Sequence, residues 1–231
     1  MTSIGAPVFE ARGASRTFTE HGGGAPVHAV RGVSATIHPG EFVVVAGPSG
    51  SGKTTFLHLL AAVDAPSAGE ILIEGQPVSA LSRNAKAEIR LQRIGLLFSE
   101  HNLSPALTAA ENVDLPLALR GLSARERRER VHSALARLGV AHLARRFPDA
   151  LSTGEQQRVA MARAVAGHPA ALIGDEPTAH LDSEAGAALL DLVQALVSER
   201  RMAAVVASHD PAVIARADRV IRLRDGAVVE D

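Results

Sequence analysis

The stretch Gly47-Pro48-Ser49-Gly50-Ser51-Gly52-Lys53-Thr54 decides the fold, because it fits the pattern G-x-x-x-x-G-K-[ST] at every specified position. The apolar run Phe42-Val43-Val44-Val45 before it predicts a buried strand, and residues 54–62 after it predict a helix. Glycines let successive backbone N–H groups point inward, and the helix start adds unpaired N–H groups and the positive end of a dipole. A glycine turn placed by chance between strand and helix would not need the lysine and threonine. The stretch therefore predicts a cradle for the phosphates of a nucleoside triphosphate.

Two side chains of this phosphate loop have separate roles. Lys53 supplies a point charge for the β- and γ-phosphates, and the Thr54 hydroxyl is a natural ligand for Mg²⁺. The residues expected to contact the nucleotide are Gly47, Pro48, Ser49, Gly50, Ser51, Gly52, Lys53, Thr54 and Thr55.

The composition limits the class of protein. Its 231 residues are 46% hydrophobic and 21% charged, enough for one sizeable packed α/β domain. A net charge of −1, from 24 basic and 25 acidic side chains, gives no electrostatic footprint for nucleic acid. The absence of cysteine excludes disulfides and thiolate chemistry. Residues 1–7 do not resemble an export signal and no apolar run approaches the ~18 residues of a membrane span, so we expect a cytoplasmic protein without direct membrane insertion.

The chain before and after the phosphate loop alternates between strands and helices. Residues 8–18 predict an edge strand, and residues 29–37 and 70–75 predict further strands with short turns, which favours antiparallel pairing beside the main sheet. Residues 83–93 predict a helix and 94–98 a buried strand. Further on, 171–175 and 203–207 predict strands, 183–200 a helix, and 219–223 with 227–229 a hairpin.

The middle of the chain is different, because residues 108–167 show helical periodicity and no convincing strand. Ser123-Ala124-Arg125-Glu126 predicts a helix cap, and the following Arg127–Arg130 run is most simply a solvated helix face, with a binding role as the alternative. The predicted fold is α/β, a P-loop NTPase core with a mainly parallel sheet, an N-terminal antiparallel β-subdomain and an inserted α-helical subdomain. We expect a single domain over residues 1–231, with the core at about 1–98 and 168–231 and the helical subdomain at about 99–167.

A second acidic strand end is expected in a phosphate-loop enzyme. Asp175 ends the apolar run Leu172-Ile173 and is the predicted Mg²⁺ ligand beside Thr54. Glu176 follows at once and is placed to polarise a water that attacks the γ-phosphate. The plainer interpretation, a strand that ends in two solvated acids, is common in isolation but less so downstream of a phosphate loop.

The stretch Leu151-Ser152-Thr153-Gly154-Glu155-Gln156-Gln157-Arg158 is the second unusual one. A Ser and a Gly just before a helix N-terminus form another end that attracts anions. One chain therefore carries two phosphate-seeking helix ends, over 90 residues apart, with a helical lobe between them.

With these motifs the chain resembles, nearly end to end, the nucleotide-binding subunits of ABC transporters. The phosphate loop resembles Walker A, residues 172–176 resemble Walker B with its catalytic glutamate, and residues 151–155 resemble the ABC signature. Residues 179–182 resemble the D-loop, Ser208-His209-Asp210 the switch histidine, and Phe18 the aromatic that stacks on adenine. The phrases at 105–113 and 154–160 are most similar to the lipoprotein-release, macrolide-export and cell-division group.

The resemblance implies a head-to-tail homodimer that holds each ATP·Mg²⁺ between Walker A of one subunit and the signature of the other. Glu176 would be the general base, and His209 would bond the γ-phosphate and the attacking water. A lone histidine is usually an ordinary surface or core residue, so His209 rises above that only through its position after a strand. The remaining nucleotide contacts implied by the motifs are Phe18, Ser99, Ser152, Thr153, Gly154, Glu155 and Asp182.

The chain departs from the family pattern at two positions. Ser99 stands where the family has a glutamine that touches Mg²⁺ and attacking water and whose loop contacts the membrane subunit. Thr153 replaces the first glycine of the signature pair, and a β-branched residue dislikes φ > 0 and obstructs close backbone approach. These departures predict slow basal hydrolysis.

The predicted function is an ATPase subunit of an ABC transporter that dimerises on ATP. It would drive separate transmembrane permease subunits, in export or extraction from the membrane, from the inner face of the cell membrane. The alternative is an ATP-gated regulatory module with little turnover. Ser99 and Thr153 favour that module slightly, whereas Glu176 and His209 favour the enzyme. The lack of a long heptad stretch argues against a third interpretation, a DNA-repair ATPase head, because those proteins insert long coiled coils.

Overall fold

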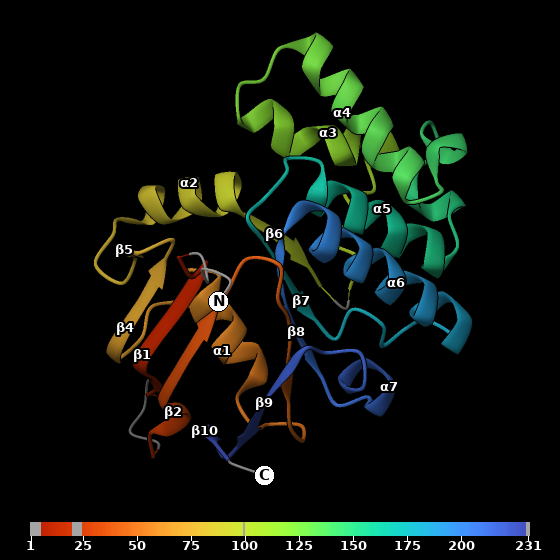
Figure 1. Cartoon of the computed structure of the whole chain (residues 1–231). Helices are drawn as coiled ribbons and strands as arrows, with labels where there is room; N and C mark the ends of the chain where they lie inside the picture. Colours follow the sequence, from red (N-terminus) through yellow and green to blue (C-terminus); the bar gives the residue numbers. More distant parts are fainter. Residues whose placement is uncertain (1–5, 20–24, 99, 230–231) are drawn as a thin grey trace, which may run out of the picture.

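The computed structural model describes residues 6–19, 25–98 and 100–229, which form two sheets and the helices around them (Figure 1). The four-stranded sheet has the order β2-β1-β4-β5 and the six-stranded sheet the order β10-β9-β3-β8-β7-β6. The strands are β1 (Phe9–Phe18), β2 (Val27–Ile37), β3 (Phe42–Ala46), β4 (Ala68–Ile73), β5 (Gln76–Pro77), β6 (Ile94–Leu97), β7 (Ala171–Asp175), β8 (Ala203–Ser208), β9 (Arg219–Arg224) and β10 (Ala227–Val228).

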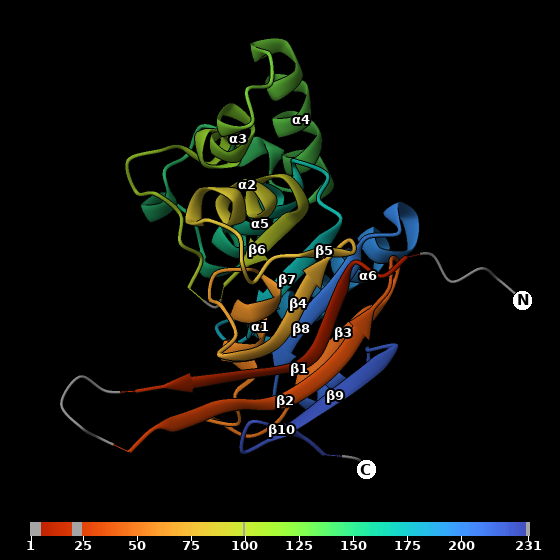
Figure 2. The same cartoon turned by 90° about the vertical axis from the view of Figure 1, so that its left-hand side faces the viewer.

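The four-stranded sheet is antiparallel throughout, as the short turns predicted. The prediction that the first strand lies at an edge was wrong, because β1 pairs with β2 on one side and with β4 on the other. Phe9 lies opposite Ile37 in β2 and opposite Ile73 in β4, and all three side chains are buried. The β1–β2 hairpin extends away from the body of the molecule (Figure 2).

The six-stranded sheet is mainly parallel, which confirms the predicted α/β class. Strands β9, β3, β8, β7 and β6 pair in parallel, and the hairpin of β9 with β10 supplies the antiparallel edge. All five residues of β3 are buried, as expected for a central parallel strand with both faces covered. The phosphate loop and Glu176 follow β3 and β7, so they meet at the carboxyl edge of the sheet.

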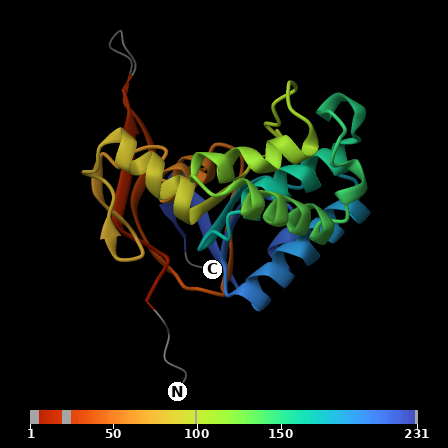
Figure 3. The same ribbon diagram turned by 90° about the horizontal axis from the view of Figure 1, so that it is seen from above.

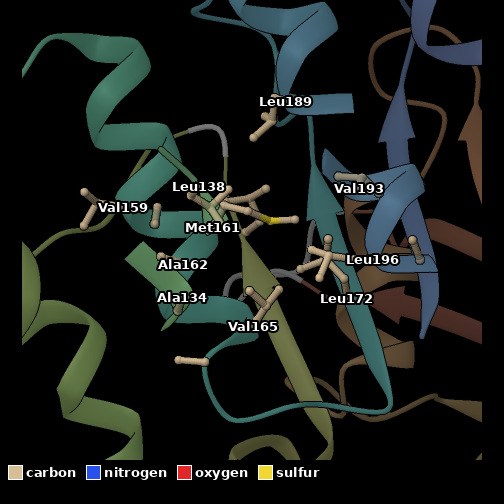
Figure 4. Packing of buried hydrophobic residues seen from close by; sticks show 14 of the residues in the cluster. Ala134, Leu138, Val159, Met161, Ala162, Val165, Leu172, Leu189, Val193 and Leu196 are labelled. Atoms are coloured by element: carbon tan, nitrogen blue, oxygen red, sulfur yellow. The ribbon is translucent and has the colours of Figure 1, made fainter. Parts of the chain in front are cut away.

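Helices cover both faces of this sheet. The helices are α1 (Lys53–Leu60), α2 (Arg83–Arg93), α3 (Ala109–Leu119), α4 (Ala124–Arg137), α5 (Thr153–Val165), α6 (Ser183–Arg200) and the short α7 (Pro211–Ile214), with 3₁₀ turns at Ala141–Leu143 and Pro148–Ala150. Val43 and Val45 of β3 pack with α1 and the antiparallel sheet, whereas Phe42 and Val44 pack on the other face. That second face meets α5 and α6 through residues such as Met161, Val193 and Leu196 (Figure 4).

The described residues from 109 to 165 contain helices and turns and no strand. Seen from above, the antiparallel sheet lies at one side of the molecule and these helices extend to the other (Figure 3). The capping box predicted at Ser123 is present, with the Ser123 hydroxyl accepting from the Glu126 N–H. Thr108 with Glu111 and Ser152 with Glu155 form two more. Reciprocal caps of this kind satisfy otherwise unpaired N–H groups, so each of the three helices has a defined first residue.

Candidate functional site

A cavity of about 650 Å³ opens beside the phosphate loop at the carboxyl edge of the sheet. It brings together seven residues that the sequence predicted from separate motifs, namely Ser49, Gly50, Gly52, Lys53, Thr54, Thr55 and Asp175, together with the predicted base and histidine, Glu176 and His209. Residues from the motifs at 47–55, 175–176 and 209 therefore line one cavity, although up to 160 positions separate the lining residues in the sequence (209 minus 49).

Glycine is required at two positions of the phosphate loop. Gly47 has φ +154° and Gly52 has φ +100°, values in the region that L side chains rarely adopt. A Cβ on Gly52 would lie 2.2 Å from the Ala29 carbonyl oxygen, and one on Gly47 would lie 2.2 Å from the Leu223 carbonyl oxygen. The loop is thus packed against β2 and β9 so closely that any side chain would displace it.

Lys53 is the first residue of α1 and only 8% exposed. Its Nζ donates to the carbonyl oxygens of Gly47 at 2.8 Å and Pro48 at 3.1 Å. An ammonium group has three N–H donors, so one remains for a phosphate oxygen. The loop therefore holds a buried positive charge in position before any nucleotide arrives.

Thr54 and Asp175 form an oxygen pair that suits Mg²⁺. The Thr54 hydroxyl donates to Asp175 Oδ2 at 2.8 Å, whereas Asp175 Oδ1 is buried with no partner among the described residues. Hydroxyl and carboxylate oxygens are the ligands that Mg²⁺ prefers, and the ion commonly takes only one or two protein ligands beside phosphates and water. Among the described residues, no three or more His, Asp or Glu side chains gather into a group that could hold a metal ion.

Glu176 is held in an uncommon backbone conformation at the end of β7. Its φ is +45°, a region that costs free energy for a residue other than glycine and is typical of functional sites. The Ser208 hydroxyl donates to Glu176 Oε2 at 3.2 Å, and His209 Nδ1 lies 2.8 Å from Glu176 Oε1. Since a carboxylate only accepts, the ring nitrogen is the donor. The His209 side chain is 71% exposed, so its other nitrogen remains available.

The predicted signature residues lie elsewhere. None of Ser152, Thr153, Gly154 and Glu155 is among the residues that line the cavity. Ser152 caps α5, and its backbone N–H and hydroxyl donate to Glu155 Oε2 at 2.8 and 2.9 Å, which lowers the pKa of the Glu155 carboxyl. The expectation that Thr153 faces strain at φ > 0 was wrong, because Thr153 is the first helical residue of α5 and its φ is not positive.

Five other predicted contacts are not among the lining residues either, namely Gly47, Pro48 and Ser51 of the phosphate loop, Phe18 and Asp182. Phe18 is 42% exposed at the end of β1, opposite Val27, which does line the cavity, and the Arg16 guanidinium lies 4.6 Å from its ring centre. Asp182 caps α6 by accepting from the Ala185 N–H at 2.8 Å. Ser99 lies outside the described residues.

Sequence reasoning missed part of the cavity wall. Its remaining lining residues are Pro26, Val27, His28, Ala29, Arg31 and Asp225. They come from β2 and from the turn between β9 and β10, which are joined by a hydrogen bond from the Arg31 N–H to the Gly226 carbonyl at 2.7 Å. No local pattern marks these residues, because the contact joins segments almost 200 positions apart (226 minus 31).

Comparisons with known proteins agree with these motifs. Residues 30–179 match the family model described as ABC transporter. The chain is 40% identical over 220 residues to the lipoprotein-releasing system ATP-binding protein LolD 2 of Caulobacter vibrioides, covering 95% of this chain and 96% of that protein. It is 44% identical over 206 residues to the macrolide export ATP-binding/permease protein MacB of Rhodospirillum rubrum, covering 89% of this chain but only 32% of that protein.

A solved structure has the same fold. The dimeric post-hydrolysis state of the ATP-binding cassette MJ0796, bound to ADP and Pi, superposes with a TM-score of 0.89 at 37% identity, covering 96% of this chain and 97% of that one. In the part of the chain that the structure describes, no helix combines the length and apolarity that crossing a membrane requires.

Proposed function

This chain belongs to the ABC transporter family, as an ATP-hydrolysing ATP-binding domain, and we propose that it drives separate membrane subunits in export or in extraction from the membrane. The observation that carries this proposal is the joint lining of one cavity by the phosphate loop, Asp175, Glu176 and His209. Export is favoured by the lipoprotein-releasing and macrolide-export relatives. On this proposal the protein works at the inner face of the cell membrane through its partners.

The cavity residues have distinct proposed roles toward ATP. Lys53 donates its remaining N–H to the β- and γ-phosphates, and the glycine-lined loop supplies backbone N–H groups. Thr54 and Asp175 would hold Mg²⁺, which neutralises charge that develops on the phosphate oxygens. Phe18 offers an exposed ring on which the adenine of ATP would stack. It lies at the end of β1, opposite Val27 of β2.

Glu176 is the proposed general base. It accepts a proton from a water whose oxygen bonds to the γ-phosphorus while the bond from that phosphorus to ADP breaks. The hydroxyl of Ser208 and the Nδ1–H of His209 hold the two carboxylate oxygens, so the base is oriented before the water attacks the γ-phosphorus. The exposed Nε2 of His209 is proposed to meet the γ-phosphate.

The signature residues are proposed to complete the cavity of a second copy. Ser152, Thr153, Gly154 and Glu155 sit at the N-terminus of α5, where unpaired N–H groups attract phosphate, yet they are absent from their own chain's cavity lining. A head-to-tail pair would bring them over the partner's γ-phosphate, with Asp182 at the contact. The dimeric ADP-bound neighbour structure supports this arrangement.

A second cavity is the proposed seat of a cytoplasmic helix from the membrane partner. It measures about 410 Å³ and is lined by residues of α2, β6, α3 and α5, where the core meets the proposed helical subdomain at about 99–167. Leu115 and Leu119 line it while 46% and 67% exposed, unusually open for leucine. Two arginines of the lining are occupied by backbone carbonyls, because Arg90 donates to Ala62 and Arg120 donates to Gly167, each at 2.5 Å. The rest of the cavity wall is mainly apolar.

Mixing two inactive variants tests the dimeric site. Lys53→Ala removes the phosphate lysine and Gly154→Asp places a carboxylate at the signature, so each homodimer has two defective sites. In a mixed dimer one site combines an intact phosphate loop with an intact signature. Random pairing makes half the dimers mixed, so we expect up to about a quarter of the wild-type rate from the mixture. A mixture as inactive as its components would refute the shared site.

The regulatory module remains the second candidate because Ser99 replaces the glutamine of the family. The proposed slow basal hydrolysis rests on Ser99 and on the Thr153 side chain, whose bulk would obstruct close approach of the backbone to phosphate, and not on a strained φ at Thr153. Ser99→Gln is expected to raise the hydrolysis rate by more than about twofold, a barrier difference of ~0.4 kcal/mol. ATP-dependent dimerisation with no turnover in either form would favour the regulatory module.

A further inference from the structure

Gln157 is a fully buried amide inside α5, about one turn into the helix that begins at the signature residues. Its Nε2 donates to the Pro177 carbonyl at 2.7 Å and to the Phe98 carbonyl at 3.4 Å. Both partners are carbonyl oxygens, so only the amide nitrogen can face them. The Oε1 atom is buried with no partner among the described residues.

The two carbonyls belong to segments with different proposed roles, one beside the general base and one at the second cavity. Pro177 directly follows Glu176, whose backbone has φ +45°, and the Ala179 N–H closes a turn onto the Glu176 carbonyl. The bond to the Pro177 carbonyl fixes the peptide between residues 177 and 178 inside this turn, which we call the base turn. Phe98 directly follows β6, and both Phe98 and Asn102 line the second cavity, so we call Phe98 and residues 100–102 the docking segment. One buried side chain therefore touches both the base turn and the proposed docking segment.

The same helix holds that segment at a second point. Arg163 of α5 donates to the carbonyl oxygen of His101 at 3.0 Å and to that of Asn102 at 2.5 Å. Burial lowers the pKa of Arg163, yet two carbonyl acceptors keep its charge compensated. Gln157 holds Phe98, and Arg163 holds His101 and Asn102. We therefore expect a movement of this segment to be transmitted to α5.

We propose that Gln157 is a positioning residue for hydrolysis, which ties the docking segment after β6 to the turn that carries Glu176. Among the described residues, Gln157 bonds both to this segment, at the Phe98 carbonyl, and to the base turn, at the Pro177 carbonyl. The proposal rests on the proposed role of Glu176. Movement of the segment would shift the Pro177 peptide, and with it the carboxylate of Glu176.

The first test compares two glutamines that each donate to a backbone carbonyl. Gln157→Leu keeps the side-chain volume and removes the donor. Gln194→Leu is the matched control, because Gln194 lies in α6, donates through Nε2 to the Arg216 carbonyl at 3.2 Å, and lines neither cavity. We expect Gln157→Leu to lower kcat by about tenfold, or ~1.4 kcal/mol, with KM for ATP within about twofold. The control should keep the wild-type kcat.

The second test separates positioning from folding. Gln157→Glu has the same shape, and burial raises the pKa of a carboxyl at this site. The protonated acid can donate to the Pro177 carbonyl and the carboxylate cannot. The ratio of variant to wild-type kcat is therefore expected to rise at least about threefold from pH about 8.5 to about 6.

Each other outcome overturns the inference. Equal kcat in the two leucine variants removes the role of Gln157, and so does a pH-independent ratio in a folded Gln157→Glu. A Gln157 variant that no longer binds ATP and also melts at a much lower temperature would show that the residue is merely structural. Glu176→Gln, measured alongside, keeps the two failures apart. If it has no effect, the proposed base is wrong; if it is inactive while Gln157 variants are normal, only this inference falls.

Discussion

Replacing Asn112 with leucine is expected to destabilise the protein by about 2–3 kcal/mol. Asn112 lies in α3, is 1% exposed and holds the chain just before that helix. Its Oδ1 accepts from the Ser104 N–H at 2.7 Å, and its Nδ2 lies 3.1, 2.9 and 3.0 Å from the carbonyls of Ser104, Leu107 and Thr108.

The magnitude follows from counting the polar groups that lose a hydrogen-bond partner. The carbonyls of Ser104 and Thr108 keep backbone partners, the Leu107 and Asn112 N–H groups respectively. The Ser104 N–H and the Leu107 carbonyl lose the partner that Asn112 gave them, at ~1–2 kcal/mol each. Leucine returns ~0.5 kcal/mol through its better helix propensity. For a chain of this size the net change corresponds to a fall in Tm of about 5–10 °C.

Urea unfolding measures the global effect, and hydrogen exchange at the Ser104 amide localises it. Asn84→Leu in exposed α2 is the matched control, with an expected change within ~0.5 kcal/mol. Asn112→Asp should be at least as harmful as leucine despite its shape, because it turns an anionic oxygen toward carbonyl oxygens. An Asn112→Asp variant as stable as wild type, or a leucine effect no larger than at Asn84, would refute this account.

Other substitutions test the site, the sheet and the caps. Gly52→Ala should weaken ATP binding more than about tenfold, because its Cβ meets the Ala29 carbonyl at 2.2 Å; unchanged binding in a calorimetric titration would show that the loop has room. Gly95→Ala should cost ~1–3 kcal/mol in chemical unfolding, because its Cβ meets the Ala164 carbonyl of α5 at 2.4 Å, and a neutral result would contradict the contact of β6 with α5. Ser123→Ala should lower Tm by about 2–4 °C at pH about 7. The bonds from Ser123 hold the pKa of Glu126 below its ordinary value, so this contribution is present above that value and is lost as pH falls through the lowered pKa. The difference in Tm between the wild type and Ser123→Ala should therefore decrease in acid, and a difference that increases would be inconsistent with the cap.

The sequence predicted what depends on local pattern. The phosphate loop, the helix over Ser183–Arg200 and the cap at Ser123 each follow from neighbouring residues, and the structure has them at those positions. The edge assignment of β1 failed because its second partner, β4, lies about 60 residues further along the chain and nothing in 8–18 announces it.

The site was predictable only as far as its motifs extend. Gln157 bonds to carbonyls 20 and 59 positions away, and a buried glutamine looks like an exposed one in sequence. His28 and Arg31 line the cavity because β2 runs alongside the turn after β9, a tertiary contact without local signal. Thr153 was expected to be strained because the family pattern has glycine there, whereas the cap of Ser152 starts the helix before it.

The measurement that most directly tests the central claim is steady-state hydrolysis of ATP with Mg²⁺ by the wild type and by Glu176→Gln, at matched ATP occupancy. The substitution keeps the shape of the side chain and its contacts with Ser208 and His209 within reach, but it removes the proton acceptor. We predict a fall of ~10²-fold or more in kcat with ATP affinity changed by less than about threefold. A variant that hydrolyses ATP at the wild-type rate would contradict the assignment of Glu176 as the base.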